Sequence, residues 1–201
     1  MITGLIEWLF TFSVRLLVGA HPKWLGCQLS QDQRIYIANH SSHLDALLLL
    51  STLPQRLRRR TRPVAAADYW TAGPIRRYLI HSIFRGVLVE RDRGALNPLE
   101  PLVCALRHED SLIFFPEGTR GSGGELQPLK PGLFHLARLF PNVDIVPVWI
   151  DNSYRILPKG FAVPVPLLCS ITFGTPLRWK EGQPRDEFMN EVREALQALQ
   201  P

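Results

Sequence analysis

Short apolar runs alternate along this chain with longer segments in which apolar residues recur every three or four positions. The runs predict β-strands at residues 34–38, 64–67, 87–89, 112–115, 145–150 and 170–173. The longer segments predict helices that begin near residues 45, 74, 97 and 131, and a final helix with an apolar stripe of Phe188, Val192, Leu196 and Leu199. This alternation predicts a single α/β domain with a mixed, largely parallel sheet flanked by helices. In such sheets, functional residues lie mostly in the loops beyond the strand ends.

The segment before the first predicted strand is the most apolar part of the chain. It is not a secretory signal peptide, because no Lys or Arg precedes its apolar residues. Thr3, Glu7, Thr11 and Arg15 recur at every fourth position and form a narrow polar stripe on an otherwise apolar helix. Two charges within the segment argue against a simple membrane span. We therefore expect residues 1–22 to form an amphipathic helix in the membrane interface; the alternative is a helix packed on the domain core.

Positive charge dominates the composition. The 201-residue chain has a net charge of +5 and a pI of about 9.4. Five arginines crowd one short segment, and three more follow: Arg56, Arg58, Arg59, Arg60 and Arg62, then Arg76, Arg77 and Arg85. The first run lacks the interleaved aromatic residues that favour single-stranded nucleic acid, so no nucleic-acid partner is expected. It is a solvated loop or a surface for anionic lipid headgroups, and on this run alone a nuclear or nucleic-acid patch stays an open alternative.

The cysteines are consistent with a protein that faces the cytosol. Cys27, Cys104 and Cys169 lie far apart and form no CxxC pair. This spacing excludes a zinc knuckle or a redox motif of that kind and indicates reduced thiols.

The first group of residues with chemical character is NHSSHLD (residues 39–45), where a predicted strand meets a predicted helix. His40 and Asp45 can meet across such a turn. The carboxylate would then fix the imidazole tautomer and stabilise its cation, so that His40 could take a proton from a substrate hydroxyl. Two alternatives stay open. Ser42 and Asp45 match a helix capping box, and His40, His43 and Asp45 could ligate zinc, although no further His or Cys cluster completes a shell.

The second group is FPEGTR (residues 115–120), which follows an apolar strand. An Arg in a Gly-containing loop at a strand end is well placed to bind phosphate through paired hydrogen bonds. The alternative is a Pro-Glu-Gly turn in which Arg120 is merely solvated.

Together the two motifs resemble the glycerolipid acyltransferases, most closely the 1-acylglycerol-3-phosphate (lysophosphatidate) acyltransferases. That family carries an N-H-x-x-x-x-D block, a block that ends in Arg, an F-P-E-G-T-R block and a V-P-V block. All four have counterparts here in the same order. The second is GVLVER (residues 86–91), which has a shorter glycine-to-Arg spacing and Glu90 where the family often has Asp, and the fourth is VPV (residues 146–148). The segment KPG (residues 130–132) also resembles the K-x-G of the family.

The resemblance implies a role for each candidate residue. His40 is expected to be the base and Asp45 its partner, in an acyltransferase catalytic domain of residues 23–201. The residues expected to bind the acceptor, with the arginines on its phosphate, are Arg91, Glu117, Gly118, Thr119, Arg120 and Lys130. No metal site and no bound cofactor is implied.

The implied reaction moves a fatty acyl group from acyl-coenzyme A or acyl carrier protein to the free hydroxyl of 1-acylglycerol-3-phosphate, which forms phosphatidic acid for phospholipid biosynthesis. Other lysophospholipids and glycerol 3-phosphate are alternative acceptors. A serine hydrolase is not expected, because the sequence has no G-x-S-x-G elbow. A non-catalytic membrane-binding protein and a metal-dependent hydrolase are the alternatives from other classes. We expect a peripheral or monotopic membrane protein on the cytoplasmic face.

Overall fold

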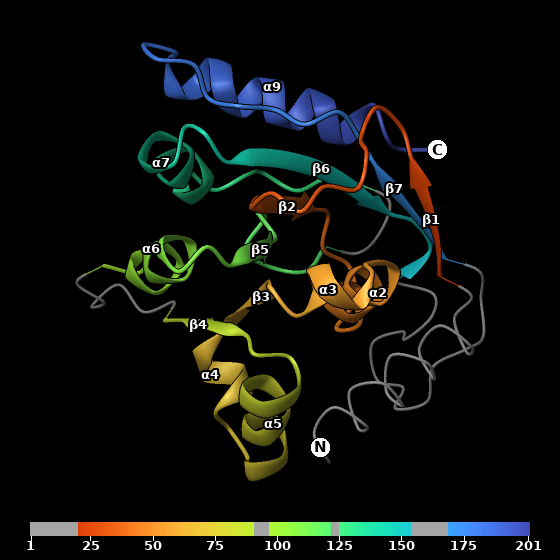
Figure 1. Cartoon of the computed structure of the whole chain (residues 1–201), viewed down its shortest axis with the longest axis vertical. Coiled ribbons are helices and arrows are strands. Elements are labelled where there is room, and N and C mark those ends of the chain that lie inside the picture. The colour runs from red at the N-terminus through yellow and green to blue at the C-terminus, as the bar shows by residue number, and fades with distance from the viewer. Residues whose placement is uncertain (1–19, 91–96, 122–124, 154–168) are drawn as a thin grey trace.

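The computed structural model describes residues 20–90, 97–121, 125–153 and 169–201, and in this part of the chain seven strands form one sheet. The strand order is β1-β7-β6-β2-β5-β3-β4 (Figure 1). Strands β6, β2, β5, β3 and β4 are parallel, whereas β7 is antiparallel to β6 and β1 is parallel to β7. The mixed, largely parallel sheet that was predicted is therefore confirmed. The strands are β1 (His21–Trp24), β2 (Arg34–Ala38), β3 (Thr61–Ala66), β4 (Val87–Val89), β5 (Ser111–Phe114), β6 (Asp144–Ile150) and β7 (Ser170–Phe173).

Helices cover both faces of the sheet. One face packs against α2 (Asp45–Thr52) and α3 (Gln55–Arg58). The other packs against α6 (Glu100–Arg107), α7 (Gly132–Leu139) and α9 (Arg185–Gln197). Between β3 and β4 the chain forms a projecting lobe (Figure 1), which consists of α4 (Ala67–Trp70), α5 (Pro74–Tyr78) and the π-helical turn η1 (Leu79–Ile83).

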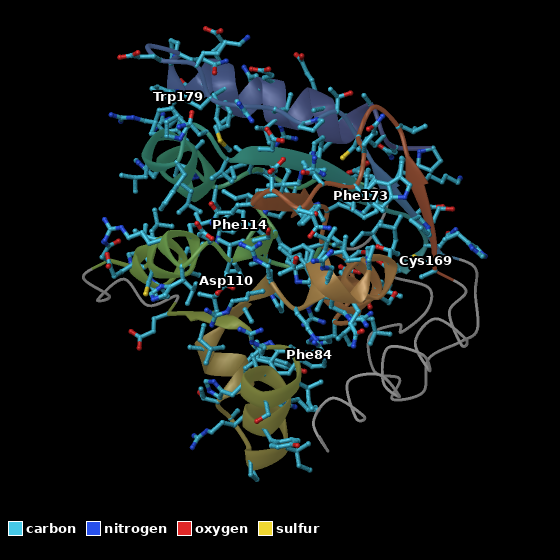
Figure 2. The ribbon with its side chains drawn as sticks, in the orientation of Figure 1. Phe84, Asp110, Phe114, Cys169, Phe173 and Trp179 are labelled. Carbon is cyan, nitrogen blue, oxygen red and sulfur yellow. The ribbon has the colours of Figure 1, made fainter. Side chains whose placement is uncertain are left out.

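The central strand β2 shows why its sequence is apolar without alternation. Ile35 and Ile37 belong to the core beneath α6, α7 and α9, whereas Tyr36 and Ala38 belong to the core beneath α2. A strand that is buried on both faces needs apolar residues at successive positions. In Figure 2, Phe173 lies beside β2, and its ring meets Tyr36 edge-on with centroids 6.1 Å apart.

The structure adds elements that hydropathy did not predict, namely β1, α3 and α4. Strand β1 pairs with β7 from His21 onward, so the sheet begins before residue 23, where the globular domain was predicted to start. Strand β3 begins at Thr61 rather than residue 64, because Thr61 and Arg62 pair with Ser111 and Leu112 of β5. Backbone hydrogen bonding to a neighbouring strand decided these bounds, whatever the side-chain pattern. Residues 1–19 of the helix predicted at residues 1–22 lie outside the described residues, whereas His21 and Pro22 belong to β1.

The arginine-rich run lies at the edge of the sheet where β3 begins. Arg60 forms an ion pair with Glu109 at 3.4 Å, and Arg62 forms one with Asp110 at 3.2 Å. Parallel strands that begin at this edge end at the opposite one, where the NHSSHLD motif follows β2. The run is thus a solvated, partly ion-paired segment on the far side of the domain from His40.

The cysteines give a direct test of the packing. Cys27 and Cys169 are buried, and burial raises the pKa of both thiols, that of Cys169 to about 12, whereas Cys104 is exposed on α6. Because the thiolate is the reactive form, we expect one fast-reacting thiol in the native protein and three after denaturation. Titration with a disulfide reagent measures this, and Cys104→Ser is the control that should abolish the fast phase. A fast-reacting thiol that remains in Cys104→Ser would contradict the burial of Cys27 and Cys169.

Candidate active site

His40 and Asp45 meet at the turn between β2 and α2. The His40 Nδ1 lies 2.8 Å from Asp45 Oδ2, and the same oxygen accepts hydrogen bonds from the backbone N–H groups of Ser41 at 2.7 Å and Ser42 at 2.8 Å. Asp45 is fully buried, whereas the His40 side chain is 21% exposed. A carboxylate on Nδ1 favours the tautomer with its proton on that nitrogen. This leaves Nε2 as the basic nitrogen available to the cavity that His40 lines.

The hydrogen bonds of this motif also agree in part with its alternative interpretation as a helix cap. Asp45 accepts from the Ser42 N–H, and the Ser42 hydroxyl accepts from the Leu44 N–H at 3.3 Å. One carboxylate therefore orders the start of α2 and orients the imidazole. The two interpretations of Asp45 describe the same set of hydrogen bonds rather than competing structures.

Two side chains tie this turn to the end of β6. The Asn39 amide donates to the Ile150 carbonyl at 3.0 Å and accepts from the Ile150 N–H at 2.7 Å, as a paired strand backbone would. The hydroxyls of Ser41 and Ser153 lie 2.7 Å apart. The sequence indicated that Asn39 and the serines shape the turn, but the partners on β6 could not be read from it.

Glu117 is not among the residues that line the cavity. The residue is 3% exposed, and its carboxylate accepts hydrogen bonds from the backbone N–H groups of His40 at 2.6 Å and Gln127 at 2.9 Å. Burial raises the pKa of this carboxyl. Both oxygens are thus occupied by the chain itself, and Glu117 holds the His40 backbone. These hydrogen bonds indicate a positioning role for Glu117, and its direct contact with the acceptor stays a prediction.

The rest of the FPEGTR loop wraps around His40. The Gly121 N–H donates to the His40 carbonyl at 2.8 Å, and the Phe115 ring stacks on the imidazole with centroids 4.2 Å apart. Strands β2 and β5 are neighbours in register, with Ile37 opposite Phe114, which brings the two motifs together directly beyond the strand ends. Phe115 was part of the recognised motif, but its contact with His40 was not predicted.

His40 opens onto a cavity of about 710 Å³, a size typical of small-molecule sites. One part of its wall is polar and carries Thr119, Arg120 and Lys130 beside His40. Most of the rest is apolar and comes from α2, β3, β5, α6 and the lobe, including Phe84 and Phe114, which are labelled in Figure 2. The cavity therefore combines a cationic part with an apolar part.

His43 has a different environment from His40. Its ring stacks on Tyr69 with centroids 4.8 Å apart. Burial, followed by the nearby Arg120 guanidinium, lowers the pKa of His43. Within the residues that the structure describes, no group of three or more His, Cys, Asp and Glu side chains is arranged to hold a metal ion.

The second block is described only in part, because Arg91 lies outside the described residues. Glu90 is exposed and lines the cavity. Gly86 is explained by packing, since an added Cβ would lie 2.3 Å from Ile80 Cδ1 and 3.2 Å from the Pro63 carbonyl oxygen. No side chain larger than hydrogen fits there without displacing the lobe.

A buried His-Asp pair at the ends of parallel strands, facing a cavity with cationic and apolar parts, is an arrangement suited to acyl transfer between lipid-like substrates. The model of the family described as Acyltransferase matches residues 27–151, and the chain belongs to this family.

Relatives and one solved structure refine the comparison. The chain is 30% identical over 175 residues to a 1-acyl-sn-glycerol-3-phosphate acyltransferase of Limnanthes alba, covering 83% of this chain and 56% of the relative. It is 32% identical over 126 residues to 1-acyl-sn-glycerol-3-phosphate acyltransferase alpha of Mus musculus, covering 60% and 41%. The chain thus spans about half the length of these relatives. The crystal structure of the 1-acyl-sn-glycerophosphate (LPA) acyltransferase PlsC from Thermotoga maritima shares the fold, with a TM-score of 0.76 and 22% identity over 98% of this chain and 78% of that one.

Gly118 offers a test of the cationic part of the cavity, which includes Lys130. It has a φ of +68°, and an added Cβ would lie 2.7 Å from the Lys130 Cε and Nζ atoms. We expect Gly118→Ala to lose roughly 1–2 kcal/mol of stability from the backbone strain and also to displace the Lys130 ammonium. Gly182→Ala is the matched control, because Gly182 has a φ of +82° with nothing within 4 Å. Denaturant unfolding should show similar losses, and only Gly118→Ala should weaken binding of a phosphate-bearing lipid. Equal lipid binding by the two variants would contradict a role for Lys130.

Proposed function

We propose that this chain is an O-acyltransferase that acylates the free hydroxyl of 1-acylglycerol-3-phosphate, with His40 as general base. The observation that carries the proposal is the His40–Asp45 pair at 2.8 Å, which faces a cavity lined by Arg120 and Lys130. The relatives are named for activity on 1-acyl-sn-glycerol 3-phosphate, and these names support the choice of acceptor.

The chemistry follows from the hydrogen bonds. The acceptor hydroxyl gives its proton to His40 Nε2 as its oxygen attacks the carbonyl carbon of the acyl thioester. The imidazolium that forms is stabilised by the Asp45 carboxylate on Nδ1. The tetrahedral intermediate then expels the thiolate, which takes the proton back from His40. The products are an ester and a free thiol, and no enzyme nucleophile is needed.

The hydrogen bonds at the start of α2 restrict which N–H groups can donate to the oxyanion. The N–H groups of Ser41 and Ser42 bond to Asp45, and that of Leu44 bonds to the Ser42 hydroxyl. These amides are not available to an oxyanion unless the turn reorganises. We therefore place the oxyanion on the side of the FPEGTR loop, where Thr119 and Arg120 line the cavity.

The cationic wall suits a phosphate monoester. Arg120 can form paired hydrogen bonds to phosphate, Lys130 adds a second charge, and by resemblance Arg91 adds a third. The apolar remainder of the cavity suits an acyl chain. The donor, acyl-coenzyme A or acyl carrier protein, and the use of the product in phospholipid synthesis are part of the proposal.

The chain is further proposed to act as a peripheral membrane protein on the cytoplasmic face, with the segment before β1 as an anchoring helix. Among the described helices, none is long and apolar enough to cross a membrane.

The first test measures thiol release from acyl-coenzyme A by the full chain in detergent, with lysophosphatidate, glycerol 3-phosphate or lysophosphatidylethanolamine as acceptor. Release is expected with lysophosphatidate. His40→Ala should lower turnover by about 10²–10⁴-fold, because general-base catalysis contributes that much. His43→Ala is the control from the same turn and should keep most of the activity.

Retention of more than a few per cent of turnover in a folded His40→Ala protein would refute the base assignment. Release from acyl carrier protein alone would change the donor and leave the base unchanged. No release with either donor, from a sample with native thiol reactivity, would refute the acyltransferase proposal.

The acceptor phosphate has its own test in Arg120→Ala. We expect KM for lysophosphatidate to rise about tenfold or more, since a charge-assisted hydrogen bond contributes roughly 1.5–3 kcal/mol. The KM for lysophosphatidylethanolamine should change less, because its phosphodiester carries less charge. Arg107→Ala removes an exposed arginine of α6 that does not line the cavity, and it serves as the charge control. An equal rise for both acceptors would show that Arg120 does not bind the phosphate monoester selectively.

A further inference from the structure

The helix α5 of the lobe is solvent-exposed along its whole length. All five residues are exposed, and Ile75, at 75%, is the most exposed large apolar side chain among the described residues. Tyr78, one turn further on, is 47% exposed. Single exposed apolar residues are common, so this pair gains meaning only from its surroundings.

The surroundings of this pair are cationic. Residues 69–89 contain Arg76, Arg77, His81 and Arg85 and no Asp or Glu. The Arg76 guanidinium lies over the Tyr69 ring, 4.4 Å from its centroid, and Arg77 donates to the Thr71 carbonyl at 3.4 Å. In the described part of the chain neither arginine forms an ion pair with a carboxylate. Both arginines are exposed, so their positive charge lies at the surface of the lobe.

The inner side of the same lobe forms part of the cavity wall. Trp70, Ile80 and Phe84 line the cavity, and Phe84 in Figure 2 lies where the lobe joins the rest of the domain. Ile80 belongs to η1, which follows α5 directly, so the exposed helix and this part of the cavity wall are consecutive in the chain.

The chain carries a second basic segment, which serves as an internal comparison. The run at residues 56–62 lies at the opposite edge of the sheet, and Arg60 and Arg62 are paired with acids there. It has cationic charge but no exposed large apolar residue. On α5 two exposed apolar side chains lie beside two exposed arginines, and this combination favours the boundary between lipid headgroups and acyl chains.

We propose that α5 docks on an anionic lipid surface, with Ile75 and Tyr78 at the headgroup–acyl boundary and Arg76 and Arg77 on lipid phosphates. This inference rests on the proposed function, because a lipid acceptor gives the lobe a reason to face the bilayer. It is independent of the predicted N-terminal anchor. In this contact the outer side of the lobe lies on the lipid surface, and its inner side forms part of the cavity wall.

The direct test places a fluorescent probe on the full-length protein. In a Cys104→Ser background, single cysteines replace Ile75, Leu139 or Arg56, each exposed and on α5, α7 or α3, and carry an environment-sensitive dye. Vesicles of phosphatidylcholine and phosphatidylglycerol are added, with and without brominated acyl chains. The dye at position 75 should shift to shorter wavelength and be quenched by bromine, and the other two should not.

Several outcomes would overturn the proposal. They are an unshifted dye at position 75 on protein that co-sediments with the vesicles, quenching at position 56 instead, and no vesicle binding at all. A response at position 75 to purified acyl carrier protein but not to vesicles would assign α5 to an acidic protein partner and also reject the lipid surface. None of these readings needs activity, so they stay informative even if no acyl transfer is found.

A kinetic test separates docking from catalysis. The variant Ile75→Ser/Arg77→Gln/Tyr78→Ser changes only exposed positions outside the cavity lining. We expect KM for lysophosphatidate in anionic vesicles to rise about tenfold, with turnover on a short-chain, monomeric lysophosphatidate unchanged. Arg56→Gln/Leu139→Ser, a charge and an apolar residue on other surfaces, should behave like the parent. An unchanged vesicle KM in the α5 variant would overturn the docking role.

Discussion

The buried carboxylate of Asp45 is the interaction on which the site depends. A buried charge is costly unless it is well paired, and Asp45 Oδ2 receives three donors from the turn that precedes it, two backbone amides and the His40 ring. The bonds that pair the charge therefore also fold the turn and orient the base. Removing the carboxylate would leave the N–H groups of Ser41 and Ser42 without this acceptor, so the geometry of the turn and the orientation of the His40 ring change together.

Glu117 is a second buried carboxylate that accepts a hydrogen bond from the backbone at His40. Its carboxylate lies on the backbone N–H of His40, so the ring is held by Asp45 and the main chain by Glu117. The two carboxylates come from the ends of neighbouring parallel strands, β2 with its following turn and β5. The preorganisation of the base is thus a property of the sheet order, which places the two strand ends side by side.

How much could be predicted from sequence depended on the type of constraint. Residues 34–38 and 170–173 matched the strands, because burial on the sheet demands continuous apolar residues there. The predicted pairing of His40 with Asp45 was also observed, since the two lie within one turn of chain. Strand β1 was missed, because it owes its existence to pairing with β7, far away in sequence. The hydrogen bonds of Glu117 could not be predicted for the same reason, because they join it to the N–H groups of His40 and Gln127 in other parts of the chain.

The hydrogen bonds of the Asn39 side chain make the site sensitive to spontaneous deamidation over time. It stands in for a strand backbone, with its amide nitrogen as donor and its amide oxygen as acceptor toward Ile150. Spontaneous deamidation would turn that donor into a carboxylate oxygen and set it against the Ile150 carbonyl oxygen, at a place where water cannot compensate. The strand ends would then separate next to the base. Chemical damage to a single amide would disable the site in old molecules while leaving the remainder of the sheet folded.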